Sequence, residues 1–331
     1  MKHLIACIFV IIGLTGCVRT GNQPAPEAFK EVFFEPQHAD GFRVLRSGSQ
    51  LMLEVYSPDT ARIVIPEGGF QRIVCMSSTY VAHLEAAGRL DRLVGASSPQ
   101  YISSERVKEM SVPDVGYDGA MNYEQLLAVK PELVMLYGIG GPSSIEGKLK
   151  ELDVPYVYIS DFEEQSPLGR AEWVVATGAL VGEDMRPMVD SVTAAYRPTS
   201  VEPVNVMINA PYSGSWFIPG RDGYMAQLLH DSGARLMVDE PEGVESKPID
   251  SELALYALSQ ARVWLCPGAS TSLAELKLAV PKARFSGYVW NQTSRFYEDG
   301  AIRPDSVLGE LKMIMQGNAT ADSLRYFYRL K

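Results

Sequence analysis

Histidine and cysteine, the side chains that most often bind transition metals, are scarce in this chain, because its 331 residues contain only four of each. Of the histidines beyond the N-terminal segment, His38, His83 and His230, none pairs with another at a metal-ligand spacing, and His83 lies in an amphipathic helical pattern that suits a structural histidine. Cys75 and Cys266 occur in the apolar runs RIVCM and VWLCPG, which are typical of buried strands. The sequence therefore predicts neither a disulfide between these cysteines nor a site for a bare metal ion.

Runs of basic residues are also missing, and the formal net charge is −10, with 30 lysines and arginines against 40 acidic residues. This balance argues against binding to nucleic acid and against electrostatic attachment to a membrane surface. The hydrophobic fraction of 46% and the charged fraction of 21% are ordinary for a packed globular protein. Any membrane attachment is therefore predicted to depend on a lipid alone.

Long apolar runs are absent except for the eleven residues from Leu4 to Leu14, which follow Lys2. This run is too short to cross a bilayer as a helix, but it has the length of the apolar region of a signal peptide. The residues Leu14-Thr15-Gly16-Cys17 resemble the lipobox of bacterial lipoproteins, in which cleavage precedes a lipidated cysteine. We expect residues 1–16 to be a signal peptide and Cys17 to anchor the protein to a bacterial membrane in the periplasm. The alternative is a non-lipidated signal peptide that ends near a chance cysteine.

The rest of the chain divides by its patterning. A polar, proline-containing segment predicts a tether without a core, and the alternating segment after it predicts a β-hairpin and is compatible with a third strand. Strands that alternate with helical segments then predict an α/β lobe, and this pattern occurs twice, with a purely helical segment between the copies. In that segment, Gly182 is expected to end one helix and Pro187 to lie in the first turn of the next. The expected domains are residues 17–40 (tether), 41–66 (β-hairpin extension), 67–160 (N-terminal lobe), 161–198 (bridging helical region) and 199–331 (C-terminal lobe).

Two stretches of the chain share one pattern, YEQLLAVKPELVMLY at residues 123–137 and SELALYALSQARVWL at residues 251–265. Each copy predicts a helix followed by a buried strand, and each has a glutamate at its second position, Glu124 and Glu252. These carboxylates are expected at exposed helix N-termini, where the helix dipole favours negative charge. Capping alone can explain one such glutamate, but the duplication favours a shared function. The residues expected to face the core are Leu126, Leu127 and Val129 in the first copy and Ala254, Leu255 and Leu258 in the second.

Five stretches occur in order along residues 70–316: RIVCMSSTYVAHLEAAGRLDRLVGAS, VGYDGAMNYEQLLAVKPELVML, PLGRAEWVVATGALVGE, GSWFIPGRDGYMAQLLHDSGA and FYEDGAIRPDSVLGEL. Together they resemble the class III periplasmic substrate-binding proteins of ABC importers, the group that serves ferric siderophores, haem and cobalamin. PLGRAEW and SWFIPG look most like the Bacteroidetes branch of this group. The resemblance implies an α/β fold of two Rossmann-like lobes bridged by a long α-helix, which here begins near Pro167.

The resemblance also implies a function and partners. It implies a binding protein without catalytic residues, monomeric, with no permanently bound cofactor, which carries an iron chelate, haem or cobalamin. Its partner is a dimeric ABC permease with its ATPase. Glu124 and Glu252, one on each lobe, are the positions expected to dock onto arginines of that permease, since paired charges orient a complex without a large apolar interface.

Ligands of doubly wound lobes bind beyond the carboxyl ends of the strands, so the loops there are expected to form the cleft. Aromatic side chains in these loops offer flat apolar surface, and arginines can neutralise carboxylates or catecholates. Tyr80 and Tyr101 could also donate a phenolate to haem iron, whereas each aromatic taken singly could instead pack its loop against its own lobe. The candidate ligand-binding residues are Ser78, Tyr80, Tyr101, Trp216, Arg221, Tyr224, Asn291 and Arg295.

The sequence is compatible with two other functions. The first is an enzyme that processes metal chelates, such as a chelatase or hydrolase, although SGSWF around Ser215 lacks the closing glycine of a nucleophile elbow and no histidine is expected in a cleft loop. The second is a surface receptor or ligand store that works without a transporter. The GIGGPSS run lacks the Lys-Ser/Thr of a phosphate-binding loop and is interpreted as a loop of the cleft.

Overall fold

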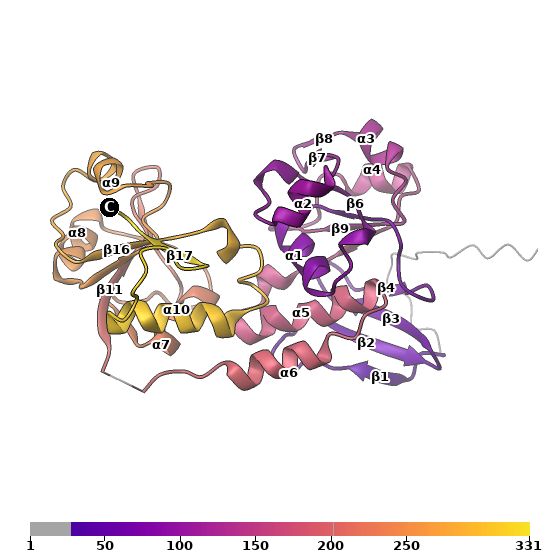
Figure 1. The fold of residues 1–331 in the computed structure, drawn as a ribbon, viewed down its shortest axis with the longest axis horizontal. Coiled ribbons are helices and arrows are strands. Elements are labelled where there is room, and N and C mark those ends of the chain that lie inside the picture. Colours follow the sequence, from indigo (N-terminus) through magenta and orange to yellow (C-terminus); the bar gives the residue numbers. More distant parts are fainter. Residues whose placement is uncertain (1–27, 201) are drawn as a thin grey trace, which may run out of the picture.

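The computed structural model describes residues 28–200 and 202–331. The predicted signal peptide, Cys17 and most of the predicted tether lie outside the described residues. Within the described ranges, no helix is both long enough and apolar enough to cross a membrane. Figure 1 shows two α/β lobes side by side, with two helices and a separate small sheet packed beneath the N-terminal lobe.

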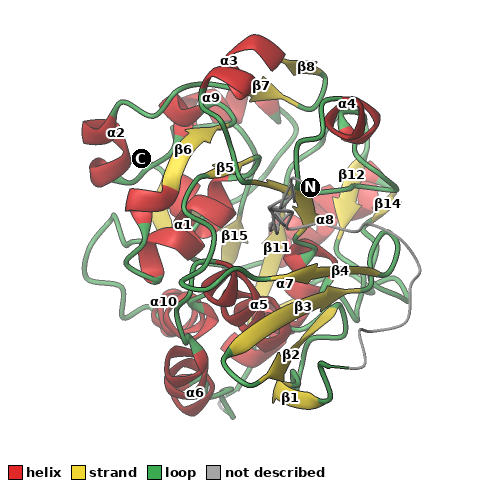
Figure 2. Ribbon diagram, turned by 90° about the vertical axis from the view of Figure 1, so that its right-hand side faces the viewer, coloured by secondary structure: helices red, strands yellow, loops and turns green. Residues whose placement is uncertain are grey.

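The first element is an antiparallel sheet with the strand order β1-β2-β3-β4, which packs against α5 (Figure 2). The alternation of residues 41–66 correctly predicted a hairpin, formed by β2 and β3, and β4 is the third strand with which the pattern was compatible. The sheet is larger than this, because β1 comes from the predicted tether. Phe29, just before β1, packs on Leu45 and Met52. The strands are β1 (Glu31–Phe34), β2 (Phe42–Ser47), β3 (Gln50–Val55) and β4 (Ala61–Val64).

Two buried glutamates, Glu172 in α5 and Glu164 just before this helix, hold the chain upstream of residue 41 in place. The carboxylate of Glu172 accepts the backbone N–H groups of residues 37–39 at 2.7–2.9 Å. Glu164 accepts those of residues 40 and 41, together with the indole N–H of Trp173. The expectation that residues 17–40 contribute no core is therefore wrong for their C-terminal part. Polar composition could not indicate this, because the bonding groups are backbone amides whose partners lie far along the chain.

Replacing Glu172 by alanine is expected to lower the free energy of unfolding by about 2–4 kcal/mol, because it removes the acceptor of three backbone amides, one buried and two partly buried. Urea denaturation followed by circular dichroism measures this loss. The exposed Glu163, replaced by alanine, is the matched control and is expected to change stability by less than about 0.5 kcal/mol. Equal effects of the two substitutions would contradict the proposed role of Glu172.

The N-terminal lobe contains a parallel sheet with the strand order β10-β9-β5-β6, as the alternation of strands and helices predicted. Short apolar strands such as Leu133–Leu136 are buried on both faces, which is typical of a parallel sheet covered by helices. The elements are β5 (Ile73–Cys75), α1 (Ser78–Ala86), β6 (Leu93–Ala96), α2 (Glu105–Met110), the hairpin β7 (Gly116–Tyr117) and β8 (Ala120–Met121), α3 (Tyr123–Ala128), β9 (Leu133–Leu136), α4 (Glu146–Glu151) and β10 (Tyr156–Tyr158).

The bridging region consists of two helices, α5 (Pro167–Leu180) and α6 (Arg186–Ala195), after a 3₁₀ turn at Asp161–Glu163. Gly182, with φ +79°, ends the first helix and Pro187 lies in the first turn of the second, as predicted. α5 is buried on nearly every side, because it packs against the small sheet, α1 and α6 and also contacts α7 and α10 of the other lobe. A helix in that position joins the two lobes mechanically.

The C-terminal lobe repeats the α/β pattern around a sheet with the order β13-β11-β15-β16-β17, in which only β17 is antiparallel to its neighbour. The predicted fold class, two α/β lobes joined by a helical bridge, is thus confirmed. The elements are β11 (Val204–Ile208), the ribbon strands β12 (Trp216–Ile218) and β14 (Lys247–Ile249), α7 (Tyr224–Ser232), β13 (Ala234–Leu236), α8 (Ser251–Gln260), β15 (Val263–Leu265), α9 (Leu273–Ala279), β16 (Tyr288–Gln292), α10 (Pro304–Gln316) and β17 (Phe327–Arg329).

Candidate functional site

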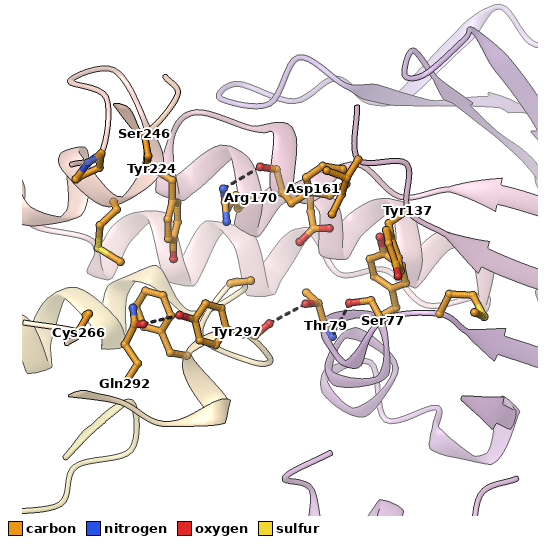
Figure 3. Close-up of a pocket in the computed structure, with 18 of the residues that line it drawn as sticks. Ser77, Thr79, Tyr137, Asp161, Arg170, Tyr224, Ser246, Cys266, Gln292 and Tyr297 are labelled. Carbon is orange, nitrogen blue, oxygen red and sulfur yellow. Dashed lines mark hydrogen bonds between the residues drawn. The ribbon is translucent and has the colours of Figure 1, made fainter. Parts of the chain in front are cut away.

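A cavity of about 580 Å³ lies between the two lobes, where the carboxyl ends of their strands face each other (Figure 3). This confirms the predicted position of the cleft, and the volume falls within the usual range for a small-molecule site. The lining comes from the N-terminal lobe, from the C-terminal lobe and from the bridging region, which forms the floor. The lining includes the polar and titratable residues Tyr80, Tyr137, Asp161, Arg170, Tyr224 and Cys266.

Arg170 is the cation of this floor. It lies in the first turn of α5, which begins at Pro167 because the Ser166 hydroxyl caps it by accepting the Gly169 N–H at 2.8 Å. Its guanidinium donates to the carbonyls of Phe162 at 2.8 Å and Glu164 at 3.2 Å. These bonds use two of five N–H donors and hold the planar group in one orientation within the cavity.

Tyr224, at the start of α7, supports the other side of the guanidinium. The Arg170 Cζ lies 3.9 Å from the centre of the Tyr224 ring, which is a close cation–π contact. Burial is the main cause that raises the pKa of Tyr224 to about 12, so its ring stays neutral. The contact joins the bridge to the C-terminal lobe and presents a cation with a flat aromatic face beside it.

Asp161 is the acidic residue of the floor, and it lies three residues after the end of β10 and is only 4% exposed. Arg170 does not bond to it, because the guanidinium places its hydrogen bonds on backbone carbonyls. Burial raises the pKa of Asp161 to about 7, and the positive charge of Arg170 limits the rise. A carboxyl group that titrates near neutrality therefore lies at the wall of the cavity.

Two tyrosines, Tyr80 and Tyr137, line the wall of the cavity that the N-terminal lobe forms. Tyr80 is 1% exposed, and its hydroxyl donates to the Ile159 carbonyl at 2.6 Å. Burial raises the pKa of Tyr80 well above its ordinary value, which opposes the phenolate form that an iron ligand needs. Tyr137 is half-buried at the end of β9, and burial also raises the pKa of its hydroxyl.

Hydrogen bonds between the lobes close one side of the cavity. The Thr79 hydroxyl donates to the Tyr297 carbonyl at 2.7 Å. The Glu298 carboxylate, 5% exposed, accepts from both the backbone N–H and the hydroxyl of Ser103 at 3.1 Å, and the hydroxyl is also bonded to Ser294. The loop of residues 97–103, which contains the candidate Tyr101, thus contacts the other lobe through Ser103.

The structure places two of the eight candidate ligand-binding residues, Tyr80 and Tyr224, on the cavity. Trp216 is fully buried, where its ring stacks on Trp264 and its N–H donates to the Ile208 carbonyl.

The other five candidates do not line the cavity. Ser78 begins α1 between two residues that do line the cavity, and Tyr101 is 77% exposed outside it. Arg221 is exposed, and Arg295 is 3.8 Å from Asp299. The buried amide of Asn291 donates to the carbonyls of Gly268 and Ser270 and so fixes a loop.

Sequence reasoning missed Asp161 and Arg170 because it assigned them to the bridge rather than to a lobe. A signal was available, since Asp161 lies three residues after a strand end and Arg170 lies in the first turn of a helix that begins near the same edge. The parallel-sheet rule that located the other loops applies to this strand end as well.

The cysteines and His83 have the structural roles that the sequence predicted. Cys75 and Cys266 are buried, unbonded and in different lobes, although Cys266 also reaches the cavity wall. His83 is buried, its Nδ1 lies 3.0 Å from the Thr177 hydroxyl, and burial lowers its pKa to about 3. Within residues 28–200 and 202–331, no cluster of three metal-binding side chains occurs.

Glu124 and Glu252 are both exposed in the first turns of α3 and α8. α3 is capped by the Asn122 side chain and α8 by that of Asp250, so neither glutamate is needed as the N-cap. The predicted core residues of both helices are buried or half-buried, except Leu127, which is 44% exposed. The helix turns by about 100° per residue, which carries Leu127 away from the buried Leu126.

Two α/β lobes, a helical bridge and one cavity between facing strand ends define a two-lobed ligand-binding protein. The periplasmic binding protein family model matches residues 73–278, and the chain belongs to this family. The family resemblance drawn from the sequence is thus confirmed, whereas the Bacteroidetes branch stays a prediction.

Relatives and solved structures agree with this assignment. An uncharacterized lipoprotein of Methanocaldococcus jannaschii is 23% identical over 282 residues, which cover 78% of this chain and 68% of the relative. A periplasmic heme binding protein from Pseudomonas aeruginosa is 18% identical, with a TM-score of 0.57, covering 79% of this chain and 98% of its own. The periplasmic vitamin B12 binding protein of Vibrio cholerae is 15% identical, with a TM-score of 0.53, covering 76% and 99%. These structures share the fold, and the family is one of binding proteins rather than enzymes.

Proposed function

We propose that this protein is the substrate-binding lipoprotein of an ABC importer, anchored in the periplasm through Cys17. It captures an iron chelate, either a siderophore complex or haem, or else cobalamin, and delivers it to a permease. The observation that carries this proposal is the interlobe cavity with Arg170 at its floor. A cation held by backbone carbonyls, with donors left over, is prepared for an anionic group of a ligand.

The chemistry of the walls supports a large, partly flat and anionic ligand. Tyr224 lies beside Arg170, Phe296 contacts Tyr224 and Tyr297 edge-on, and all three rings line the cavity. Aromatic rings next to a single fixed cation suit chelates that combine carboxylates, catecholates or a phosphate with a broad apolar surface. The buried hydroxyl of Tyr80 favours stacking and packing over iron ligation.

The two lobes each offer a carboxylate for a permease. Glu124 on α3 and Glu252 on α8 are exposed, and each lies near an exposed apolar side chain on the same helix, Leu127 on α3 and Leu253 on α8. A glutamate beside an exposed leucine on each lobe suits a basic pocket with an apolar margin on the permease. Two such contacts would orient the complex and speed its association. A ligand store without a transporter would have no use for this duplication.

A binding screen tests the proposed function. The full mature chain is titrated separately with haem, cobalamin and a ferric tricatecholate, and binding is followed by quenching of tryptophan fluorescence. Trp264 is a suitable reporter, because its indole N–H donates to the carbonyl of Asn209, which lines the cavity. We expect tight binding of at least one probe with one site per chain. If none of the three binds, the proposal is wrong.

A further inference from the structure

Asp161 has the features of a ligand contact rather than of a structural acid. It is nine-tenths buried or more, it lines the cavity, and Figure 3 shows its carboxylate between Arg170 and Thr79, directed into the space between the lobes. The backbone N–H groups of its own turn, those of Asp161 and Phe162, interact with this carboxylate. Arg170, the nearby cation, donates its hydrogen bonds to backbone carbonyls instead. The Asp161 side chain lines the cavity, where a ligand can bond to it.

We infer that Asp161 in its neutral form and Arg170 together hold one anionic oxygen group of the ligand, so that the ligand binds together with a proton. Arg170 supplies positive charge and N–H donors, and the protonated Asp161 donates its O–H to the same carboxylate, phenolate or phosphate. This inference rests on the proposed function, and it specifies the ligand group that the floor recognises. Ionised Asp161 would instead repel that group at short range.

The charges at the floor of the cavity determine whether ligand binding takes up or releases a proton. In the unliganded protein, the positive charge of Arg170 keeps the pKa of Asp161 from rising above about 7. An anion bound to Arg170 offsets that charge and adds a negative one, so the pKa of Asp161 rises and a proton is taken up. The titratable and charged groups around Asp161 are Arg170 on α5, Glu163 and Glu164 in the same turn, Tyr80 on α1, Tyr137 after β9 and Tyr224 on α7.

The sign of the pH dependence can be stated for affinity. Below the pKa of the free protein, Asp161 is already protonated and the affinity does not change with pH. Between the pKa of the free protein and the higher pKa of the complex, each complex must take up a proton, so the affinity falls by up to about tenfold per pH unit. Binding is therefore strongest in mildly acidic solution and weaker in alkaline solution.

Calorimetry in two buffers of different ionisation enthalpy tests the inference directly. Haem, cobalamin and ferric tricatecholate are each titrated into the full mature chain at pH 7.5, and the difference between buffers gives the number of protons taken up. We expect roughly 0.5–0.8 proton per bound probe for the wild type, and a value near zero for Asp161→Asn, which cannot titrate. Asp190→Asn, an exposed aspartate on α6, is the matched control and keeps the wild-type value.

The outcomes separate this inference from the proposed function. If a probe binds the wild type without proton uptake, the inference is overturned while the carrier function stands, whatever the variants do. If D161N takes up as many protons as the wild type, another group titrates and the assignment to Asp161 is overturned. If no probe binds, the proposed function fails and the inference fails with it.

Discussion

Replacing Arg170 by glutamine lowers the affinity for an anionic probe by about a hundredfold, because a desolvated charge pair is lost and the ligand anion is left without its partner. The change is read as the dissociation constant of whichever of haem, cobalamin or ferric tricatecholate binds the wild type. Arg170→Lys is expected to recover only part of the affinity, since an ammonium group cannot keep both the carbonyl bonds and the stacking on Tyr224.

The matched control is Arg221→Gln, which removes an exposed arginine of the C-terminal lobe that does not line the cavity. Its affinity should stay within about twofold of the wild type, because an exposed charge in water interacts weakly at a distance. Thermal unfolding of all variants checks that R170Q remains folded. Equal losses for R170Q and R221Q would show that net charge, rather than the floor of the cavity, governs binding.

Reversing the charge at both Glu124 and Glu252 abolishes stimulation of the transporter ATPase and leaves ligand affinity unchanged. A lysine at either position faces the basic pocket that the glutamate is proposed to enter, and like charges at an interface cost several kcal/mol. Each single reversal is expected to weaken stimulation at least about tenfold, and the double reversal to remove it. The assay uses the ABC permease and ATPase that are proposed as partners, reconstituted in vesicles and supplied with loaded wild-type or variant protein.

Glu109→Lys and Glu245→Lys, together in one chain, are the control for this experiment. Both glutamates are exposed, one on each lobe, and the double variant has the same net charge as the docking variant. It should stimulate the ATPase as the wild type does. Unchanged stimulation by the Glu124 and Glu252 variant would refute the docking assignment, and stimulation absent even for the wild type would favour a receptor or store without a transporter.

Much of the fold could be predicted because it depends on local patterns. The two copies of the helix–strand sequence, around Glu124 and Glu252, each fold as expected, since apolar spacing and the capping residues Asn122 and Asp250 are local properties. The break between α5 and α6 at Gly182 followed from backbone conformation alone, as a positive φ favours glycine. The order of strands and helices is also a local pattern, and it predicted two lobes that are each built on a mainly parallel sheet.

Other features depended on contacts between distant segments. The aromatic residue Trp216 looked suited to stacking on a ligand, but the core of its own lobe surrounds it on all sides. Residues 37–40 have the composition of a tether, but their backbone amides donate to the carboxylates of Glu172 and Glu164. Composition describes how polar a segment is, and it does not say which distant group will satisfy its hydrogen bonds.

The chain's own patterns were sufficient for the lobes, the bridge, the exposed pair of glutamates and the strand ends where the cavity lies, because periodicity, capping and strand direction act over a few residues. Tertiary structure decided that Asp161 is buried at the floor of the cavity near the charge of Arg170, with Tyr224 of the other lobe against the arginine. Burial of a carboxyl group and the place of a cation beside it arise only when both lobes close around the bridge. The charge that we propose to select the ligand, and the proton that we infer to accompany it, are therefore properties of the assembled cavity.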